Sequence, residues 1–461
     1  MTYRTRRKLF FVSTFLFLII SVPLLFYTFG YRFSFSDRAL RQTGGVFIHS
    51  NPASSHVIVG SIIRTTSFIT GNTFIQNLDP GTHELTVSHK GFQQWKKSLL
   101  ILPSAVTEAY PILMPTFPQH TVLLTGSTTS IHTSLDASIL LLDSDHSVQP
   151  VRVYDAVAKH FLAFENASSQ SLAASIPPDA SWQWDNSNAY ALIQTPGDWL
   201  ELRRTNNSVR IESLYKQTEL SLLINERPRF MARDPNNPST YFVLAGTNFA
   251  RWERTTGSFK QLLQSIGGFF VSPAHLTFWD TQNGQPYETD LLSTNARLWA
   301  TTSIADISRA TMYETTDSLI LLADNGLWLM PRNGSTPILL EKTYDPQRVL
   351  ITQSYVLWWD DHTATIYWTL PVNDLPTFQT QRQEIIYQTD SNLQRIAFYP
   401  GEYYFIVQDT NMLFTLELDG RGDTRNKHII YEGANLVFHV PPEERIIYIL
   451  DEGSLFTINL P

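Results

Sequence analysis

The side chains best placed to do chemistry in this chain are acidic residues that sit in turns between short apolar runs. Carboxylates gathered on one surface could attract cations or a basic partner. Two of the turns also carry a histidine, His146 and His362, and a histidine beside two aspartates could hold a divalent metal. The acidic turn residues are Asp143, Asp145, Asp198, Asp324, Asp360, Asp361, Asp409, Asp451 and Glu452.

Turn chemistry accounts for the same residues without any ligand. Asp is favoured in tight turns because its side chain bonds to the backbone two residues further on. The tripeptide Arg421-Gly422-Asp423 matches a short adhesion motif, but it lies in a loop and has the same explanation. No nucleophile elbow, HExxH, GxGxxG, P-loop or EF-hand pattern occurs. We therefore predict no catalytic residue, metal or cofactor, and treat the acidic residues as a hypothetical binding rim.

The elements that must position these turns form an internal repeat over residues 116–461. In each copy an apolar strand leads through an Asp/Asn/Gly turn into a strand with a central aromatic residue, as in Val356–Trp359 followed by Thr365–Trp368. Six copies are clear, and weaker ones lie near Ile139 to Asp155 and Leu276 to Leu291. The copies recur roughly every 43 residues, which matches the 40–45 of a propeller blade.

The two ends of the repeat region fit a closed ring. The last copy ends after its third strand, and Thr121–Thr125, before the first copy, has no local partner. In a ring this segment would supply the missing outer strand and leave few exposed edges. We predict an eight-bladed β-propeller, with seven blades as the alternative because two copies are weak. All turns between second and third strands would then share one face, where the acidic residues would form a rim.

Four tryptophans lie in the middle of predicted strands. At such positions we expect them to pack between blades rather than form a platform for sugars. They are Trp199, Trp252, Trp328 and Trp368.

Residues 44–115 predict a separate small β-sandwich of five or six short strands divided by Pro and Gly turns. Its motifs are Ser50-x-Pro52, Val57-x-Val59-Gly60, Leu78-x-Pro80-Gly81-x-His83-x-Leu85-x-Val87 and Gly91-Phe92-x-x-Trp95. With these motifs in this order, the region resembles the PEGA domain family. The resemblance implies a noncatalytic β-sandwich of a kind common in envelope and surface-layer-associated proteins.

The segment Leu9–Gly30 contains 22 uncharged, mostly apolar residues. As a helix it would reach roughly 33 Å, enough to cross a hydrocarbon core of about 30 Å. Its apolar run is longer than that of a signal peptide, and no A-x-A site follows it, so we expect an uncleaved single-pass anchor. The chain has no cysteine, which excludes a lipoprotein anchor and disulfides. Basic residues within 1–8 favour a cytoplasmic N-terminus, followed beyond the anchor by a stalk, 31–43, outside the cytoplasm.

The overall charge argues against a nucleic-acid partner. The net charge is −8 even though four basic residues precede the apolar segment, whereas phosphate recognition needs clustered Lys and Arg. The leading hypothesis is a noncatalytic, membrane-anchored envelope protein that binds or scaffolds an extracytoplasmic protein or envelope polymer through its propeller. The alternatives are an extracytoplasmic hydrolase or lyase acting at the propeller channel, and a sensor subunit with a signalling partner. A histidine and a carboxylate meeting at the channel mouth would favour the enzyme.

Overall fold

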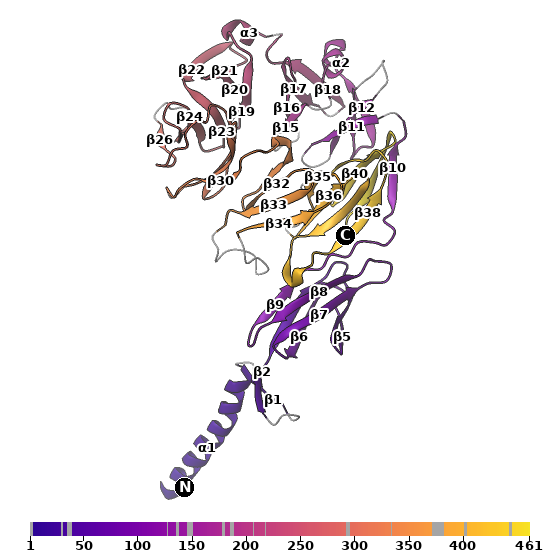
Figure 1. Cartoon of the computed structure of the whole chain (residues 1–461), viewed down its shortest axis with the longest axis vertical. Helices are drawn as coiled ribbons and strands as arrows, with labels where there is room; N and C mark the ends of the chain where they lie inside the picture. The colour runs from indigo at the N-terminus through magenta and orange to yellow at the C-terminus, as the bar shows by residue number, and fades with distance from the viewer. Residues whose placement is uncertain are drawn as a thin grey trace.

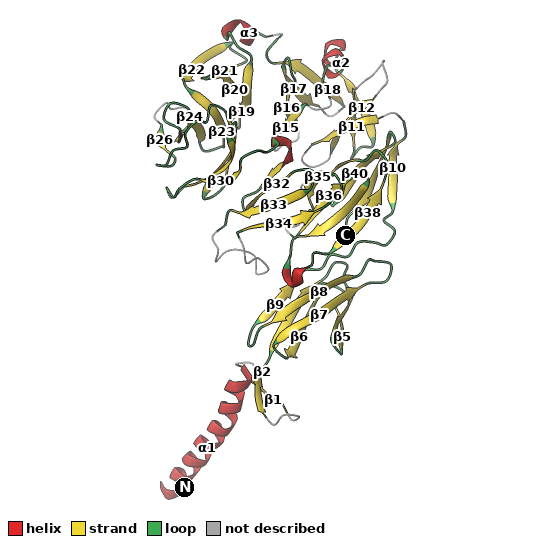
Figure 2. Ribbon diagram, viewed as in Figure 1, coloured by secondary structure: helices red, strands yellow, loops and turns green. Residues whose placement is uncertain are grey.

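The structure, a computed structural model, is built mainly of β-strands, as the sequence predicts, with one long helix at the N-terminus (Figure 2). Along the chain, this helix is followed by a small β-rich domain and then by a large set of sheets (Figure 1). The residues described are 3–28, 31–34, 39–126, 128–134, 138–144, 151–177, 180–184, 189–205, 207–216, 218–291, 296–332, 334–370, 382–400, 403–441 and 445–461.

Helix α1 (Tyr3–Thr28) covers nearly all of the predicted apolar segment. Its large apolar side chains from Leu9 to Leu25 are 45–68% exposed wherever they are described. Among the described residues, no helix is both long enough and apolar enough to span a membrane. Where the sequence predicts a stalk, β1 (Tyr31–Ser34) pairs antiparallel with β2 (Ala39–Gln42), so this segment contains a short hairpin.

The small domain consists of two sheets with strand orders β6-β3-β9 and β5-β4-β7-β8. Alternate side chains of β8 are buried, which is the pattern of a strand with one face on a core. Both sheets contribute to that core, for example through Val46 and Trp95, each fully buried. The strands are β3 (Gly44–His49), β4 (His56–Val59), β5 (Ile62–Thr65), β6 (Asn72–Leu78), β7 (Gly81–Ser88), β8 (Trp95–Ile101) and β9 (Val106–Ala109).

Two local features of the small domain differ from a simple reading of its sequence. The sequence predicts a last strand over 108–114, but β9 ends at Ala109, because Pro111 has no N–H to donate to a ladder. The β4–β5 hairpin turns through Gly60 and Ser61. Gly60 has a φ of +58° there, a conformation that glycine adopts without strain.

The remaining strands form successive groups of four antiparallel strands, mostly meanders in which neighbours in sequence pair. The fourth strands of the first two groups also pair with each other in parallel, which joins these two groups into one eight-stranded sheet. The groups are β11 (Thr128–Thr133), β12 (Ile139–Ser144), β13 (Val151–Asp155) and β14 (His160–Phe164); β15 (Ser181–Trp184), β16 (Tyr190–Gln194), β17 (Trp199–Arg204) and β18 (Ser208–Ser213); β19 (Pro228–Asp234), β20 (Asn237–Ala245), β21 (Asn248–Glu253) and β22 (Ser258–Leu263); β23 (Ile266–Val271), β24 (Leu276–Asp280), β25 (Gln285–Thr289) and β26 (Arg297–Leu298); β27 (Ala310–Glu314), β28 (Ser318–Ala323), β29 (Gly326–Pro331) and β30 (Ile338–Glu341); β31 (Val349–Ile351), β32 (Tyr355–Trp359), β33 (Thr363–Trp368) and β34 (Gln383–Gln388); β35 (Leu393–Phe398), β36 (Tyr404–Asp409), β37 (Met412–Glu417) and β38 (Lys427–Glu432); and β39 (Val437–His439), β40 (Ile446–Asp451) and β41 (Ser454–Asn459) with β10 (His120–Leu124).

The last group closes as the sequence predicts. Strand β10 pairs antiparallel with β41, with Thr121 opposite Thr457. The first and last parts of the region therefore share one sheet, and Figure 1 shows magenta β10 beside yellow β40. This pairing confirms the expected role of the segment before the first repeat.

Apolar cores join every strand group to the next. Ile320 of β28 packs in one cluster with Val356 of β32, for example, and the cycle closes where Leu140 of β12 meets Leu455 of β41. Equivalent clusters lie between the other neighbours. The sheets therefore pack face to face around a propeller-like ring.

The predicted packing role holds for most of the tryptophans. Trp199, Trp252 and Trp368 are at most 2% exposed and lie in these shared cores. Trp328 is half-buried and packs against another of the shared cores. Short helices decorate the connections: α2 (Ala167–Ala173), α3 (Leu220–Leu223), η1 (Pro346–Arg348) and η3 (Arg421–Asp423).

Candidate functional site

The ring has two faces that the meander topology keeps apart. In each group the first strand is innermost and the fourth outermost, as the position of β10 shows. The turns between second and third strands and the starts of the innermost strands lie on one face, called here the hairpin face. The turns between first and second, and between third and fourth, strands lie on the other, called here the docking face.

The described acidic turn residues all lie on the hairpin face, at or beside the turns where the sequence predicts them. Asp324, Asp360, Asp361 and Glu452 are exposed and Asp451 is half-buried, whereas Asp143, Asp198 and Asp409 are buried. Asp145 and His146 lie outside the described residues. The exposed members are therefore the ones that a partner could contact directly.

The buried aspartates Asp198 and Asp409 accept hydrogen bonds from within the protein, Asp198 inside its own strand group and Asp409 from the end of the preceding group. Asp198 accepts hydrogen bonds from the Trp199 backbone N–H at 2.8 Å and from Ser213 Oγ at 2.7 Å. Asp409 accepts from Tyr387 Oη at 2.6 Å and from Thr389 Oγ1 at 2.8 Å. Burial would raise the pKa of Asp409, but these hydrogen bonds outweigh it and lower the pKa.

Asp143, Asp324 and Asp451, three other members of the predicted rim, also have side-chain partners within the protein. Asp143 accepts a hydrogen bond from Ser130, and Asp324 from Ser308. Asp451 accepts from Tyr431 Oη at 2.9 Å. These partners are side chains 13 to 20 residues away and not the backbone of the turn itself. Joint binding by the rim stays a prediction.

In the turn that contains His362, the Asp360 side chain binds backbone N–H groups of the turn. The Asp360 carboxylate accepts the backbone N–H groups of His362 and Thr363, each at 2.7 Å. Burial would raise the pKa of Asp360, but these backbone hydrogen bonds outweigh it and lower the pKa. The His362 ring lies 3.0 Å from the Ser391 carbonyl oxygen, and Asp361 pairs with Arg348 at 2.6 Å.

Sequence analysis missed the basic residues that lie between these acids. Arg227, Arg229 and Arg309 lie at the starts of innermost strands and line one hollow on the hairpin face. Arg348 lies at the equivalent place before β31. A recurring arginine just before the first strand of a repeat is the signal that could have revealed them. Asp280, at the end of β24, is a further acid in a second-to-third-strand turn, and it was missed because that copy of the repeat is weak.

On the docking face, His275, Glu288 and Glu314 bring ligand atoms within 4.8 Å of one another. The distance between His275 Nε2 and Glu314 Oε2 is 2.7 Å, so a histidine and a carboxylate do meet at the end of an innermost strand. However, Arg332 lies 2.7 Å from Glu288 and 3.6 Å from Glu314. A guanidinium already supplies the positive charge that a metal would bring to these carboxylates.

The environment of Glu314 also suits a structural role better than acid–base catalysis. Burial would raise its pKa, but hydrogen bonds from Trp299 and His275 outweigh burial and hold the pKa below its ordinary value. Thr277 Oγ1 donates a further bond at 3.1 Å. A carboxylate held ionised by this many donors is a poor general acid or base near neutral pH.

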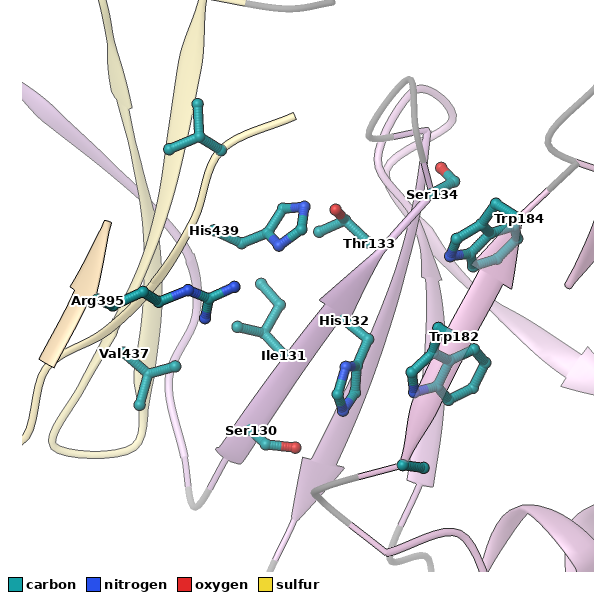
Figure 3. A pocket seen from close by; sticks show the side chains of 12 residues that line it. Ser130, Ile131, His132, Thr133, Ser134, Trp182, Trp184, Arg395, Val437 and His439 are labelled. Atoms are coloured by element: carbon teal, nitrogen blue, oxygen red, sulfur yellow. The ribbon is translucent and has the colours of Figure 1, made fainter. Parts of the chain in front are cut away.

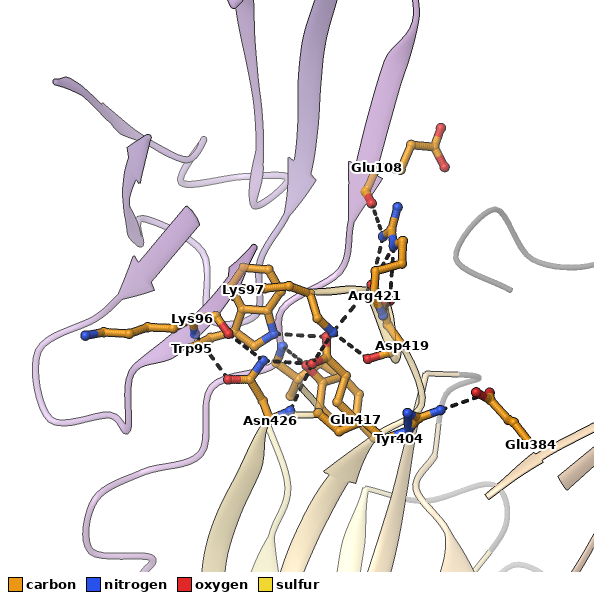
Figure 4. A network of polar contacts seen from close by, with 12 residues as sticks. Trp95, Lys96, Lys97, Glu108, Glu384, Tyr404, Glu417, Asp419, Arg421 and Asn426 are labelled. Atoms are coloured by element: carbon orange, nitrogen blue, oxygen red, sulfur yellow. Dashed lines mark hydrogen bonds and ion pairs between the residues drawn. The ribbon is translucent and has the colours of Figure 1, made fainter. Parts of the chain in front are cut away.

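The small domain is joined to the ring at the docking face by a buried ion pair (Figure 4). Lys97 of β8 is fully buried, and its Nζ lies 2.7 Å from Glu417 Oε2 and 2.5 Å from the Asp419 carbonyl oxygen. Trp95 Nε1 donates to Glu417 Oε1 at 3.0 Å. Asn426 exchanges hydrogen bonds with the backbone of Lys96, each at 3.1 Å.

Further contacts extend this joint across several segments of both domains. Tyr110 stacks on Tyr403, with ring centroids 4.5 Å apart and planes 6° from parallel. The Ile112 backbone N–H donates to Tyr404 Oη at 3.1 Å. Arg421, in the adhesion-like tripeptide, donates to the Glu108 carbonyl oxygen at 2.6 Å. The tripeptide therefore belongs to the joint.

Proteins similar to this chain are found among solved structures. No protein-family model matches it, and no curated protein matches it. Among solved structures it is similar to a Myceliophthora thermophila Cps50 (Swd1) β-propeller domain, with 11% identity, 74% of this chain and 100% of that chain covered, and a TM-score of 0.36. It is also similar to a eukaryotic initiation factor, with 9% identity, 77% and 87% coverage and a TM-score of 0.44. A third, Porphyromonas gingivalis dipeptidyl peptidase 4, has 9% identity, 72% and 56% coverage and a TM-score of 0.42.

Proposed function

We propose that this chain is a noncatalytic, membrane-anchored scaffold of the cell envelope that presents a β-propeller to an extracytoplasmic protein or polymer. In this proposal residues 9–30 cross the membrane, residues 44–115 are a PEGA-like sandwich, and residues 116–461 are an eight-bladed propeller. The cycle of shared cores and the β10–β41 pairing support eight blades.

The observation that carries the proposal is the buried joint around Lys97. Two domains linked only by a flexible connection would leave a propeller free to tumble at the membrane. Here a fully buried ammonium group is neutralised by carboxylates of the other domain. Separating the domains would expose or unpair these charges, and breaking a buried pair costs about 3–5 kcal/mol. The joint therefore favours one fixed orientation.

The strand topology indicates which face of the propeller lies toward the small domain. The joint involves two connections of one strand group. One joins its third strand, β37, to its fourth, β38, and the other joins its first strand, β35, to its second, β36; both lie on the docking face. The hairpin face lies at the opposite ends of the same strands. A propeller held in this way directs its hairpin face, with Asp324, Asp361 and Glu452, away from the small domain and toward a partner.

The exposed apolar surface of α1 supports the anchoring part of the proposal. Leu, Ile, Val and Phe side chains point outward all around the helix from Leu9 to Leu25. Apolar surface of this extent needs a lipid or protein environment. A bilayer covers every side of a helix at once, which fits the absence of a polar stripe in this segment.

Cysteine labelling in intact cells tests the anchoring and its orientation. The chain has no cysteine, so Thr5→Cys, Lys90→Cys and Gln282→Cys each create a single reporter. We expect all three proteins in the membrane fraction. A membrane-impermeant maleimide should label the variants at 90 and 282 in intact cells, and the variant at 5 only after permeabilisation. Recovery in the soluble fraction, or the reverse labelling pattern, would contradict the proposal.

Capture from detergent-solubilised membranes tests partner binding by the hairpin face. The triple variant Asp324→Asn, Asp361→Asn and Glu452→Gln removes exposed charge there but keeps polar side chains. A matched triple variant, Asp79→Asn, Glu84→Gln and Asp317→Asn, removes the same charge elsewhere. We expect wild type and control to retain the same partner and the hairpin-face variant to lose it. Equal capture by all three proteins would remove the rim from the proposal.

A further inference from the structure

A cavity of about 430 Å³ opens in the channel of the ring, between the innermost strands β11, β15, β35 and β39 (Figure 3). This volume falls in the range of roughly 300–1,000 Å³ found for small-molecule sites. Trp182 and Trp184 lie on one wall, and Arg395 and His439 lie on the opposite one. The cavity is distinct from the acidic turns and from the domain joint.

Three of the side chains that line the cavity, those of Trp182, Trp184 and Arg395, can only donate hydrogen bonds. Trp182 Nε1, Trp184 Nε1 and Thr133 Oγ1 are buried, and none of the three has a hydrogen-bond partner among the described residues. Arg395 adds the donors of its guanidinium group. Buried donors without acceptors are costly, so a ligand rich in acceptor oxygens would satisfy groups that the protein leaves open.

The net charge of the cavity is positive. Within the described part of the chain, no carboxylate pairs with Arg395, whose guanidinium lies 5.4 Å from the centre of the Phe438 ring. Burial, with help from Arg395 and His132, lowers the pKa of His439 to about 3, so this ring is neutral near pH 7. No acidic residue is among the described residues that line the cavity, and Ser130, which lines it, donates a hydrogen bond to Asp143. Burial lowers the pKa of Arg395, and an anion bound beside the guanidinium would favour its charged form.

The indole pair adds a shape requirement. The rings of Trp182 and Trp184 are stacked, with centroids 6.2 Å apart and planes 15° from parallel. With His132, whose ring centroid lies 5.3 Å from that of Trp182, they form an aromatic wall of the cavity. The apolar face of a sugar ring packs against such a wall, while its hydroxyl oxygens can accept from the indole N–H groups.

We propose that this cavity binds a hydroxylated ring that carries a carboxylate, of which a hexuronic acid is the simplest example. The carboxylate pairs with Arg395, the ring lies against Trp182 and Trp184, and ring hydroxyl groups accept from the open donors. An acidic polysaccharide or a free sugar acid could supply such a group. This site needs neither the membrane anchor nor the acidic rim.

Isothermal titration of the detergent-purified full chain tests the site, with D-glucuronate, D-glucose and acetate as probes. We expect D-glucuronate to bind at least tenfold more tightly than either of the others, because only it has both the carboxylate and the ring. If an oligomer of glucuronate binds more tightly than the monomer, the natural ligand is part of a polymer. If the two bind equally, the natural ligand is a free sugar acid. Undetectable glucuronate binding, or equal binding of glucose or acetate, would overturn the proposal.

Matched variants locate the binding. Arg395→Gln should weaken glucuronate binding at least tenfold, since a hydrogen bond to a charged group is lost. Arg309→Gln removes the same charge from the hollow on the hairpin face and should leave binding unchanged. Trp182→Phe keeps an aromatic ring in the wall but removes an N–H donor, so it should weaken glucuronate binding several-fold. If Arg395→Gln fails to fold, this variant tests the location of the site instead. Wild-type affinity in Trp182→Phe and Arg395→Gln, or an equal loss in Arg309→Gln, would overturn the assignment.

Discussion

Lys97 and Lys96 are adjacent residues of one strand with opposite environments. Lys97 is fully buried between Glu417 and Asp419, whereas the Lys96 side chain is exposed. Alternation along β8 places one toward the ring and the other toward solvent. The pair therefore offers a matched test of what a buried charge contributes.

We predict that Lys97→Met destabilises the protein by about 3–5 kcal/mol, because it leaves a buried carboxylate without its partner. Lys96→Met, the same substitution one residue away, should stay within about 0.5 kcal/mol of wild type. Urea unfolding followed by tryptophan fluorescence measures both. Equal midpoints for the two variants would show that the buried pair does not hold the joint.

Glu314 predicts an acid-dependent loss of stability. Its pKa in the folded protein lies below the ordinary value of 4.5. Its contribution is therefore complete above about pH 4.5 and is lost as the pH falls through the lower folded value. We expect wild type to exceed Glu314→Gln in unfolding temperature at pH 6, and the gap to shrink below pH 4.

The matched control for this pH series is Glu84→Gln, which changes an exposed glutamate of the small domain. Its unfolding temperature should run parallel to that of wild type over the same pH range. A gap between wild type and Glu314→Gln that stays constant from pH 6 to pH 3 would contradict the role assigned to Glu314.

At the residue scale, the sequence predicts which residues lie in turns better than it predicts which residues they contact. Asp residues in turns follow from local chemistry, and Asp198 and Asp360 indeed bond to nearby backbone groups. The pairing of Asp361 with Arg348 joins residues 13 apart through the meeting of two connections. The Lys97–Glu417 contact joins residues 320 apart. Such contacts depend on the assembled fold and leave no local pattern.

At the scale of elements, strand β10 is the closing segment, and among the described strands it pairs with β41 alone and has its other edge unpaired. Successive N–H groups of such an edge strand point alternately toward the partner and away from it. Proline removes an N–H group, so it should be tolerated at one of two adjacent residues and harmful at the other.

We therefore predict that only one of the single variants Thr121→Pro and Val122→Pro loosens the ring. That variant should lose about 1–3 kcal/mol, the typical effect of an unmade backbone hydrogen bond. Hydrogen exchange at β41 should accelerate in the same variant, while the other variant serves as its control. Unchanged β41 protection in both would mean that β10 does not close the ring.

The predicted elements agree with the structure where the periodicity is strong. The clear repeats each correspond to a second and third strand, and the weak copy at Leu276 to Leu291 forms β24 and β25. The segment predicted as a stalk contains the β1–β2 hairpin instead. Strands of four residues are too short to show a reliable period of two, so composition alone suggested a linker there.

At the scale of the whole molecule, the order of the parts can be predicted from the sequence, but their relative placement cannot. Repeat length and strand pattern predict a propeller-like ring, and the shared cores confirm that general architecture. The cavity beside Arg395 combines residues from β11, β15, β35 and β39, which only ring closure brings together. Similarly, the joint that fixes the small domain forms only after both domains are folded.

Fixed placement of the propeller on the small domain is the central claim. Spin labels introduced by Lys90→Cys and Gln282→Cys, one in each domain, allow a pulsed electron–electron distance measurement in the otherwise cysteine-free chain. The buried joint predicts one narrow distance distribution, which Lys97→Met should broaden and Lys96→Met should not. A broad or multiple distribution in the protein with its native Lys97 would contradict the account.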